Sequence, residues 1–387
     1  MPPLRVLHVI PSVSPRDGGP TRAIGIIERA LCEAGVLVTT LTTDHDVEHH
    51  GKTCVPAAVS GARRIHAHKW FDTYKVAPGL VPRLMQEVER HDVVHIHFLF
   101  SFASTAAAWA ARRQRVPYIV RPLGTLCGYG LHMRRRRLKR LSMALIEEPI
   151  LRRAAAVHFT SQAEQDEVEA LGLPMRGIVI PLGVDGEDGP PCAPMGYTAL
   201  AGRRVILFMS RLDPKKNAEA LIDAVAASPI LRSSCALLMA GTGAPRYAAS
   251  LKARVAAAGL SDRTVWLGHV EGAEKRAALA VADVFVLPSF SENFGIAAVE
   301  ALLAGVPCVL GKGVAVAREV EEAGAGLAVA PEPTAVARAL EHVLGDEGLR
   351  TGMRARASAF ANRQYSVQTM AQRLLALYEK ILNGNTC

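Results

Sequence analysis

The chain has 387 residues, of which 50% are hydrophobic and 21% are charged. This length favours two domains over one, and the composition allows a large buried core. The most apolar runs are broken by Glu292, Glu300, glycine or proline before the ~20 apolar residues that a membrane-spanning helix needs, so no such helix is expected. The first residues, Met1–Pro11, are too few and too strand-like for a secretory signal, which predicts a cytoplasmic protein.

The formal net charge of +9 at pH 7 favours an anionic partner. Much of the excess lies between His132 and Leu141, most densely in Arg134–Arg140. A solvated helix face is one interpretation of this basic segment. We favour contact with anionic lipid head groups, or with the pyrophosphate of a lipid carrier, because the interleaved aromatic residues typical of nucleic-acid binding are missing. The protein would then lie on the inner face of the cell membrane, with no nucleic-acid partner.

The first half alternates strand and helix patterns in the βαβ manner. A helix is predicted at Thr21–Ala34, closed by Gly35. The predicted strands are Leu4–Ile10, Val36–Thr42, Asp92–His97, Tyr118–Val120, Ala156–Thr160 and Gly177–Pro181. Between the first strand and the first helix, Asp17-Gly18-Gly19-Pro20 is either an ordinary turn or a loop whose backbone amides reach a phosphate.

A stretch rich in glycine and proline, Asp185 to Tyr197, predicts a hinge between the two halves. Beyond it, the strand pattern restarts at Arg204–Met209, Ala236–Ala240, Thr264–Leu267, Val284–Leu287 and Val306–Leu310. Each half is therefore predicted to form a doubly wound sheet. The pattern of Val367–Leu382 is typical of an amphipathic helix. Its apolar residues on or near one face are Met370, Leu374, Leu375, Leu377, Tyr378 and Ile381.

The segment from Val284 to Pro307 predicts a buried strand, a polar loop and an apolar helix capped by Asn293. Glu300 is an anomaly in that helix, because a buried carboxylate must find hydrogen-bond donors. The hydroxyls of a ribose would supply them, and a buried arginine is the structural alternative. The free amides at the helix N-terminus favour a phosphate, and they belong to Phe294, Gly295 and Ile296.

Glu292 and Glu300, with seven residues between them in the run P-S-F-S-E-N-F-G-I-A-A-V-E, resemble the paired-glutamate signature of the family 4 (group 1) retaining glycosyltransferases. These enzymes use nucleotide sugars. Their GT-B fold is α/β, with two Rossmann-like, doubly wound domains that face a central cleft. The resemblance implies that Glu300 binds the nucleotide ribose, that Glu292 contacts the donor sugar, and that Asn293, Phe294, Gly295 and Ile296 belong to the donor site.

The resemblance also implies a domain arrangement. Residues 1–185 would form the acceptor-side domain, which closes at the family's P-x-G-V-D marker, here Pro181 to Asp185. Residues 186–364 would form the donor-side domain. The last helix, within residues 365–384, would dock back on the first domain.

Two cations follow the first strand of the second domain. Arg211 and Lys216 resemble the family's G-R-L-x-x-x-K-G element, which implies that both bind the donor diphosphate. Ser210 and Asn217 stand where the family has glycine, and Lys215 is an alternative to Lys216. Sugar transfer requires stabilisation of the departing diphosphate. We therefore expect Arg211, Lys216 and Glu292 to be catalytic, without a metal.

Six further donor-side residues are implied by the same resemblance. Gly18 and Gly19 would cover the donor phosphate. Gly241, Gly243, His269 and Val270 would lie near the base, although from the residues alone a plain strand-ending turn is the preferred interpretation of these two loops. Uracil and guanine remain open as the base.

The acceptor side departs from the family pattern. Many relatives carry a histidine after a later strand of the first domain, and Arg121 occupies that place here. His97 is an acceptor-side candidate at the end of its strand, with a structural role as the alternative, and His95 is expected to be structural. Asp44-His45-Asp46, with the nearby Glu48, His49 and His50, imitates a metal motif, but its spacing fits no standard zinc site and predicts a solvated turn.

The sequence therefore predicts a metal-independent, retaining hexosyltransferase with a UDP- or GDP-linked donor. No cofactor is expected, because the nucleotide sugar is a substrate. The expected acceptor is a glycan or lipid-linked glycan of cell-envelope or exopolysaccharide biosynthesis. Two alternatives are a sugar-nucleotide epimerase of similar fold, which would lack the paired glutamates, and a non-enzymatic protein that binds nucleic acid through Arg134–Arg140.

Overall fold

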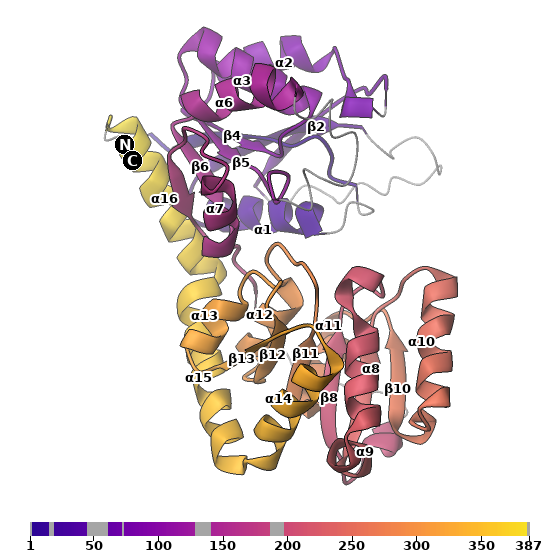
Figure 1. The fold of residues 1–387 in the computed structure, drawn as a ribbon. Coiled ribbons are helices and arrows are strands. Elements are labelled where there is room, and N and C mark those ends of the chain that lie inside the picture. Colours follow the sequence, from indigo (N-terminus) through magenta and orange to yellow (C-terminus); the bar gives the residue numbers. More distant parts are fainter. Residues whose placement is uncertain are drawn as a thin grey trace. The chain divides into compact units, whose positions relative to one another are not determined.

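The computed structural model describes residues 2–14, 19–44, 61–71, 73–127, 141–185 and 197–384. The chain divides into two compact units (Figure 1). Unit 1 comprises Met1–Gly183 and Val367–Cys387, and unit 2 comprises Val184–Ser366. The chain passes from unit 1 to unit 2 after Gly183 and returns after Ser366, in each case two residues from the boundaries expected at 185 and 364.

Unit 1 is built on a seven-stranded parallel sheet in the order β3-β2-β1-β4-β5-β6-β7. The strands are β1 (Arg5–Val9), β2 (Leu37–Thr43), β3 (Arg63–Ala67), β4 (Val93–His97), β5 (Tyr118–Arg121), β6 (Ala156–Phe159) and β7 (Gly177–Val179). All but β3 were predicted from their apolar residues.

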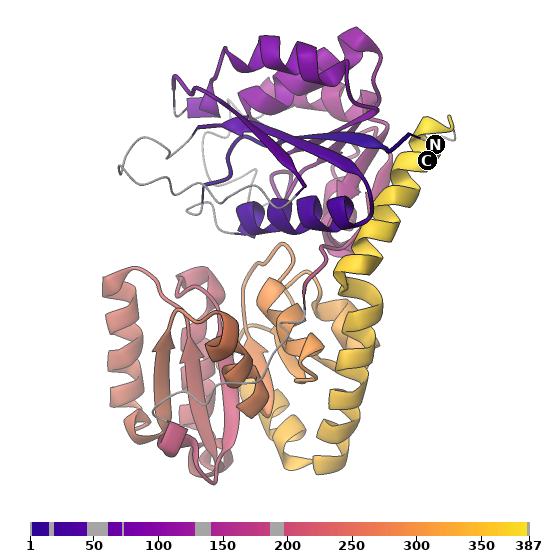
Figure 2. The ribbon, with the colours of Figure 1, turned by 180° about the vertical axis from the view of Figure 1, so that it is seen from behind.

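The helices of unit 1 cover both faces of this sheet. They are α1 (Gly19–Glu33), α2 (Leu80–Val88), α3 (Phe102–Gln114), α6 (Glu148–Arg153), α7 (Gln162–Glu169) and α16 (Val367–Leu382), with a π-helix at Met143–Glu147 and a short 3-10 helix at Thr73–Lys75. Figures 1 and 2 show α2 and α3 on one face and α1 on the other. α16 packs beside α1, with Met370, Leu374, Leu377 and Tyr378 buried, whereas Leu375 and Ile381 are only half-buried.

The missed strand β3 has a physical explanation. Its side chains are mostly polar, and Arg64 forms a buried ion pair with Glu28 of α1. Thr40 of β2 donates a second hydrogen bond to Glu28, at 2.6 Å. β3 therefore contributes a charged side chain to a buried ion pair, where an apolar pattern was sought.

Unit 2 is built on a six-stranded parallel sheet in the order β10-β9-β8-β11-β12-β13. The strands are β8 (Arg204–Met209), β9 (Cys235–Ala240), β10 (Thr264–Gly268), β11 (Val284–Leu287), β12 (Cys308–Gly311) and β13 (Gly326–Val329). The predicted bounds of β8 and β11 are confirmed, and β13 was missed because it is a short Gly-Leu-Ala-Val run.

Eight helices are described around this second sheet. They are α8 (Ala218–Ala227), α9 (Pro229–Ser234), α10 (Pro245–Ala257), α11 (Gly272–Val281), α12 (Ile296–Leu303), α13 (Ala317–Glu322), α14 (Pro333–Gly345) and α15 (Glu347–Tyr365). Among the helices described in either unit, none combines the length and the apolar character needed to cross a membrane.

Each sheet has one topological switch point, where the strand order reverses. In unit 1 it lies between the neighbours β1 and β4, and in unit 2 between β8 and β11. Ligands of open parallel sheets bind outside the carboxyl ends of the strands at such points. The loops after these four strands are therefore where functional residues are expected.

Candidate functional site

The loops after β8 and β11 bring a lysine and a glutamate together in unit 2. Lys216 is only 9% exposed, and its Nζ forms an ion pair with Oε2 of Glu292. Burial, together with the charges of Lys215 and Arg211, lowers the pKa of Lys216 to about 8. Of the two neighbouring lysines, Lys216 is therefore the one that meets the signature glutamate at the switch point.

Asn217 explains one departure from the family pattern. Its φ is 56°, a left-handed conformation in which asparagine is tolerated better than most residues other than glycine. Its Nδ2 donates to the carbonyl oxygens of Pro288, at 3.2 Å, and Pro331, at 2.8 Å. The amide of Phe290 in turn donates to the carbonyl of Lys215 at 3.0 Å. Asn217 thus keeps the backbone that a glycine would allow and fastens the loop after β8 to the loop after β11.

Gly241 and Gly243 lie against the loop that carries the exposed Arg211. A Cβ on Gly241 would stand 1.8 Å from the carbonyl oxygen of Ser210, and a Cβ on Gly243 would stand 1.9 Å from that of Leu212. Both glycines therefore have a structural reason, which is the close approach of two loop backbones. Their contact with a nucleotide base stays a prediction.

The start of α12 corrects the expected helix cap. Asn293 is not the N-cap: the helix begins at Ile296, and its N-cap is Gly295 with a φ of 91°. The loop before it is held extended, since the amide of Glu292 donates to Gly313 and the carbonyl of Glu292 accepts from Ala315. A side chain at position 295 would be strained and would stand 3.1 Å from Val314 Cγ1.

The amides at the start of α12 fit the expected anion site. Within the part of the chain that the structure describes, the N–H groups of Phe294, Gly295 and Ile296 have no hydrogen-bond partner. The ring of Phe294 is buried edge-on against Tyr365, with the centroids 5.6 Å apart. Only the backbone of Phe294 can therefore meet a ligand, and a helix N-terminus with free amides favours an anion.

Glu300 has a partner that the sequence did not reveal. Lys275 of α11 lies with its Nζ 2.9 Å from Oε1 of Glu300, and both side chains are buried. The structural alternative of a buried cationic partner is thus confirmed in kind, with a lysine as the partner that the structure describes. A lysine within the alanine-rich run of α11 was the available signal. A ribose at Glu300 would meet a carboxylate that is already paired with Lys275.

The two predicted residues after β10 differ in exposure. The side chain of His269 is 72% exposed, with Nε2 3.7 Å from Oε2 of Glu271, whereas Val270 is buried. β10 lies two strands from β8 in the sheet. Base recognition near His269 and Val270 stays a prediction.

In unit 1, Gly19 is the first residue of α1, and a Cβ there would meet no atom within 4 Å. Contact of Gly18 or Gly19 with a phosphate stays a prediction, and Gly18 lies outside the described residues. The basic segment Arg134–Arg140 also lies outside them. So does the metal-like cluster except Asp44, whose Oδ2 lies 2.7 Å from Nδ1 of His68.

The two acceptor-side candidates are both buried. His97, the last residue of β4, has Nε2 2.9 Å from Nδ1 of His8 and its ring stacked on His95 at 4.7 Å. Arg121, the last residue of β5, is 1% exposed, and burial lowers its pKa to about 10 despite the nearby Glu164. Contact of either residue with an acceptor stays a prediction.

His95 lies between Tyr378 and His158 in a chain of hydrogen bonds. Nε2 of His158 lies 2.8 Å from the carbonyl oxygen of Ile180, which can only accept. Nδ1 of His158 must then accept from Nε2 of His95 at 3.3 Å, and Nδ1 of His95 from the Tyr378 hydroxyl at 2.9 Å. The chain ties α16 to the sheet, which confirms a structural role for His95.

His8, His95 and His97 bring one nitrogen each within 4.8 Å of one another. The cluster does not suit a cation, because His95 uses both nitrogens in hydrogen bonds and His8 is bonded to His97. The buried guanidinium of Arg121 adds positive charge and lowers the pKa of these rings, after the larger effect of burial. The cluster is best described as internal packing of neutral imidazoles.

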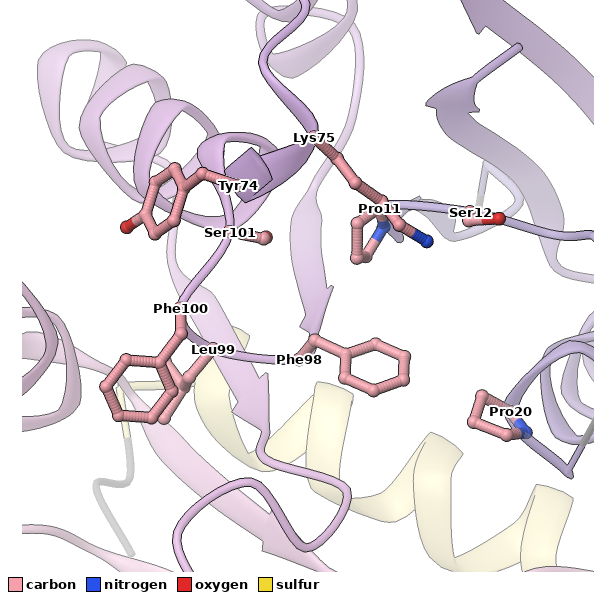
Figure 3. A pocket seen from close by; sticks show the side chains of 9 residues that line it. All are labelled: Pro11, Ser12, Pro20, Tyr74, Lys75, Phe98, Leu99, Phe100 and Ser101. Atoms are coloured by element: carbon pink, nitrogen blue, oxygen red, sulfur yellow. The ribbon is translucent and has the colours of Figure 1, made fainter. Parts of the chain in front are cut away.

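A pocket of about 420 Å³ opens at the switch point of unit 1 (Figure 3). No pattern in the sequence predicts this pocket. It is lined by Pro11 and Ser12 after β1, by Pro20 of α1, by Tyr74 and Lys75, and by Phe98–Ser101 after β4. Of seven non-glycine residues with positive φ in the described chain, four line this pocket: Tyr74, Lys75, Phe98 and Phe100. Such strained backbone clusters at functional sites.

Buried polar groups hold the strained wall in place. The Tyr74 hydroxyl lies 3.1 Å from Oγ1 of Thr105 and 3.4 Å from Oε1 of Glu147. Glu147 is fully buried in the π-helix, and burial raises its pKa. Single π-helical turns often mark functional sites. The Ser104 hydroxyl donates to the carbonyl of Phe98 at 2.9 Å. Tyr74 and Phe98 are thus both held by hydrogen bonds to residues outside the pocket lining.

Two parallel α/β units, each with a candidate site at its switch point, define a two-domain protein of the Rossmann-like class. Residues 18–183 match the family model described as a glycosyl transferase 4-like domain, and residues 198–360 match the model of glycosyl transferases group 1. The chain belongs to the group 1 glycosyltransferases, and its fold is of the GT-B type. This family membership decides for the transferase over the epimerase.

Three curated relatives show the breadth of the family. 2-Deoxystreptamine glucosyltransferase of Streptomyces kanamyceticus is 31% identical over 75% of this chain and 78% of that relative. Phosphatidyl-myo-inositol mannosyltransferase of Mycobacterium leprae is 33% identical, but the alignment spans only 58% of either protein. D-inositol 3-phosphate glycosyltransferase of Paenarthrobacter aurescens is 27% identical over 98% of this chain and 97% of that relative.

Solved structures share the whole architecture. Anabaena HepE in complex with UDP has a TM-score of 0.75 at 22% identity, covering 97% of this chain and all of that one. Sucrose-phosphate synthase of Thermosynechococcus elongatus has a TM-score of 0.74 at 20% identity, covering 98% and 100%. At these identities the likeness establishes the fold, which confirms the predicted fold class.

Proposed function

We propose that the protein is a retaining glycosyltransferase that moves a sugar from a UDP- or GDP-linked donor to an acceptor hydroxyl. The observation that carries this proposal is the switch point of unit 2. There the buried Lys216 pairs with Glu292, the exposed Arg211 precedes Lys216 in the same loop, and the amides of Phe294 to Ile296 at the start of α12 have no partner among the described residues. Cations and free amides at one sheet edge suit a diphosphate.

The residues of this site would divide the work of the reaction. Lys216 and Arg211 would stabilise the negative charge that grows on the leaving diphosphate. Glu292 would hold hydroxyls of the donor sugar, and Glu300 those of the nucleotide ribose. Complexes of HepE with UDP and with UDP-glucose support a nucleotide-sugar donor by analogy of fold.

The chemical step balances without a protein nucleophile. The acceptor oxygen forms a bond to the anomeric carbon as the bond from that carbon to the diphosphate oxygen breaks. The bonding electron pair stays on the nucleoside diphosphate, and the acceptor proton passes to a leaving phosphate oxygen on the same face. The step needs neither a metal nor a cofactor as co-reactant.

The acceptor would be a glycan or a lipid-linked glycan of cell-envelope or exopolysaccharide assembly. The relative that acts on phosphatidyl-myo-inositol supports a membrane acceptor. The basic segment Arg134–Arg140 is the proposed contact with the inner membrane face, and its role stays a prediction from sequence.

The proposal is tested by replacing both cations, Arg211→Ala with Lys216→Ala. Donor breakdown and transfer are followed by release of UDP or GDP from a panel of nucleotide sugars. We expect the double variant to lose transfer while it keeps its melting temperature within a few degrees. Undiminished nucleotide release in the double variant would rule the assignment out.

A further inference from the structure

Phe290 is an exposed aromatic residue on the loop that follows β11. The residues before it, from Val284 to Ser289, are buried, whereas Phe290 is 57% exposed, and Glu292 of the proposed donor site comes two residues later. Single exposed apolar residues are common on protein surfaces. Phe290 differs by its place, because it follows a strand of the switch point, where ligands of open parallel sheets bind.

The backbone of Phe290 is held on both sides although its ring is exposed. Its amide donates to the carbonyl oxygen of Lys215 at 3.0 Å, which ties it to the loop after β8. On the other side lies Gly313, where a Cβ would stand 2.1 Å from the carbonyl oxygen of Phe290. Only a glycine allows this close approach. The ring is therefore presented from a fixed backbone, which lowers the entropy cost of packing a ligand against it.

Charged side chains lie next to this ring in the two loops. Lys216 follows the residue that accepts the Phe290 amide, and its Nζ forms an ion pair with Oε2 of Glu292. The cluster thus offers an apolar surface together with hydrogen-bonding groups. A pyranose ring has the same division, since C–H groups cover its faces and hydroxyls surround its edge. A sugar is therefore a ligand whose chemistry matches this cluster.

We propose that Phe290 forms one wall of the donor-sugar subsite, where its ring packs against a C–H face of the sugar that is transferred. The inference rests on the proposed function, in which Glu292 binds hydroxyls of the same sugar while the ribose and the base lie at Glu300 and near His269. Phe290 then contributes to the affinity for a nucleotide sugar and not to the affinity for the nucleoside diphosphate alone.

The test compares a nucleotide with its sugar conjugates in the full-length protein. UDP and GDP are titrated first, followed by UDP-glucose, UDP-galactose and UDP-N-acetylglucosamine if UDP binds, or GDP-mannose if GDP binds. Calorimetry gives the ratio of the Kd of the nucleotide to the Kd of the tightest conjugate. Phe290→Ala should lower this ratio about 2- to 10-fold, the scale of one aromatic packing contact, and leave the Kd of the nucleotide unchanged.

Further variants separate a sugar contact from a structural role. Phe290→Tyr keeps an aromatic ring and should keep the ratio. Ile230→Ala removes a similarly exposed apolar side chain, 64% exposed at the start of α9, and should change neither Kd. Because the ring of Phe290 is exposed, Phe290→Ala should also leave the melting temperature nearly unchanged.

Three results would overturn the inference. The first is an unchanged ratio in Phe290→Ala. The second is an equal loss of affinity for the nucleotide and its conjugate, which would assign the ring to the base or the ribose. The third is binding of the nucleotide without binding of any conjugate. In each case a nucleotide still binds the wild type, so only the sugar subsite fails. If neither nucleotides nor nucleotide sugars bind the wild type, the proposed function itself fails.

Discussion

The two switch points carry different side chains. In unit 2, charged side chains from the loops after β8 and β11 form an ion pair. In unit 1, the loops after β1 and β4 line a mostly apolar pocket with one lysine. The two sheets share a topology of reversal at a central strand pair. The side chains on their loops nevertheless differ, since one switch point carries paired charges and the other is lined mostly by apolar side chains.

The largest effect is expected from replacing Lys216 at the switch point of unit 2. Lys216→Met should lower kcat about 10²- to 10³-fold, the usual loss when one charge-stabilising group is removed from a reacting centre. Steady-state nucleotide release measures this effect. Lys215→Met is the matched control, because its neighbour and not Lys215 pairs with Glu292. Equal losses in both variants would contradict the assignment.

Acid should act mainly on unit 1. Burial, with the charge of Arg121 as a smaller cause, lowers the pKa of His8 and of His158 to about 3. Below pH 6.5 these histidines are protonated in the unfolded chain but stay neutral in the folded one. The free energy of unfolding therefore falls as the pH falls from about 6.5 toward 3. These two histidines should cost roughly 3 kcal/mol between pH 7.5 and 5.5.

Urea unfolding at several pH values measures that loss. The exposed His269 in unit 2 supplies the control, since His269→Gln should leave the pH dependence unchanged. A free energy of unfolding that stays constant down to pH 5 would contradict the neutral histidine cluster.

A third expectation concerns the attachment of α16. Tyr378→Phe removes the donor to Nδ1 of His95 and leaves a buried acceptor unsatisfied, which should cost about 1–3 kcal/mol in the free energy of unfolding. Tyr247→Phe is the comparison in unit 2, where the lost partner Glu219 stays accessible to water and the cost should be smaller. Equal costs would argue against the buried chain of hydrogen bonds.

The smallest expected effect is a pH dependence of donor binding. With its pKa at about 8, Lys216 loses its charge as pH rises above 8, so the Kd for UDP or GDP should increase by up to tenfold per pH unit. Lys216→Arg keeps the charge and should flatten this dependence. A wild-type Kd that is constant from pH 7 to pH 9.5 would exclude Lys216 as the titrating group.

The two switch points also differ in what the sequence revealed. In unit 2, the strand bounds of β8 and β11 and the meeting of Lys216 with Glu292 follow from local apolar runs and a long motif. Asn217 shows how a departure from the motif preserves its geometry, because the side chain replaces glycine in a left-handed position. Lys275 was missed because its partner Glu300 is on another helix.

In unit 1 the local pattern was misleading. His97 and Arg121 end strands and were therefore expected at the sheet edge, yet both side chains are enclosed. The pocket residues Tyr74, Lys75 and Phe98 belong to segments that meet only through the tertiary fold, and their left-handed backbone leaves no pattern in the sequence. Strand β3 was missed for a related reason, since the buried partner of its Arg64 is Glu28 on α1.

A donor site in unit 2 is tested most sharply by calorimetric titration of the full-length protein with UDP and with GDP. We expect saturable binding of one of them at one site per chain. This binding should weaken at least about tenfold in Lys216→Met, as loss of a charge-assisted contact implies, and stay unchanged in Lys380→Met, at an exposed lysine of α16. Absence of binding for both nucleotides, or equal affinity in the wild type and Lys216→Met, would contradict a donor site at the carboxyl ends of β8 and β11.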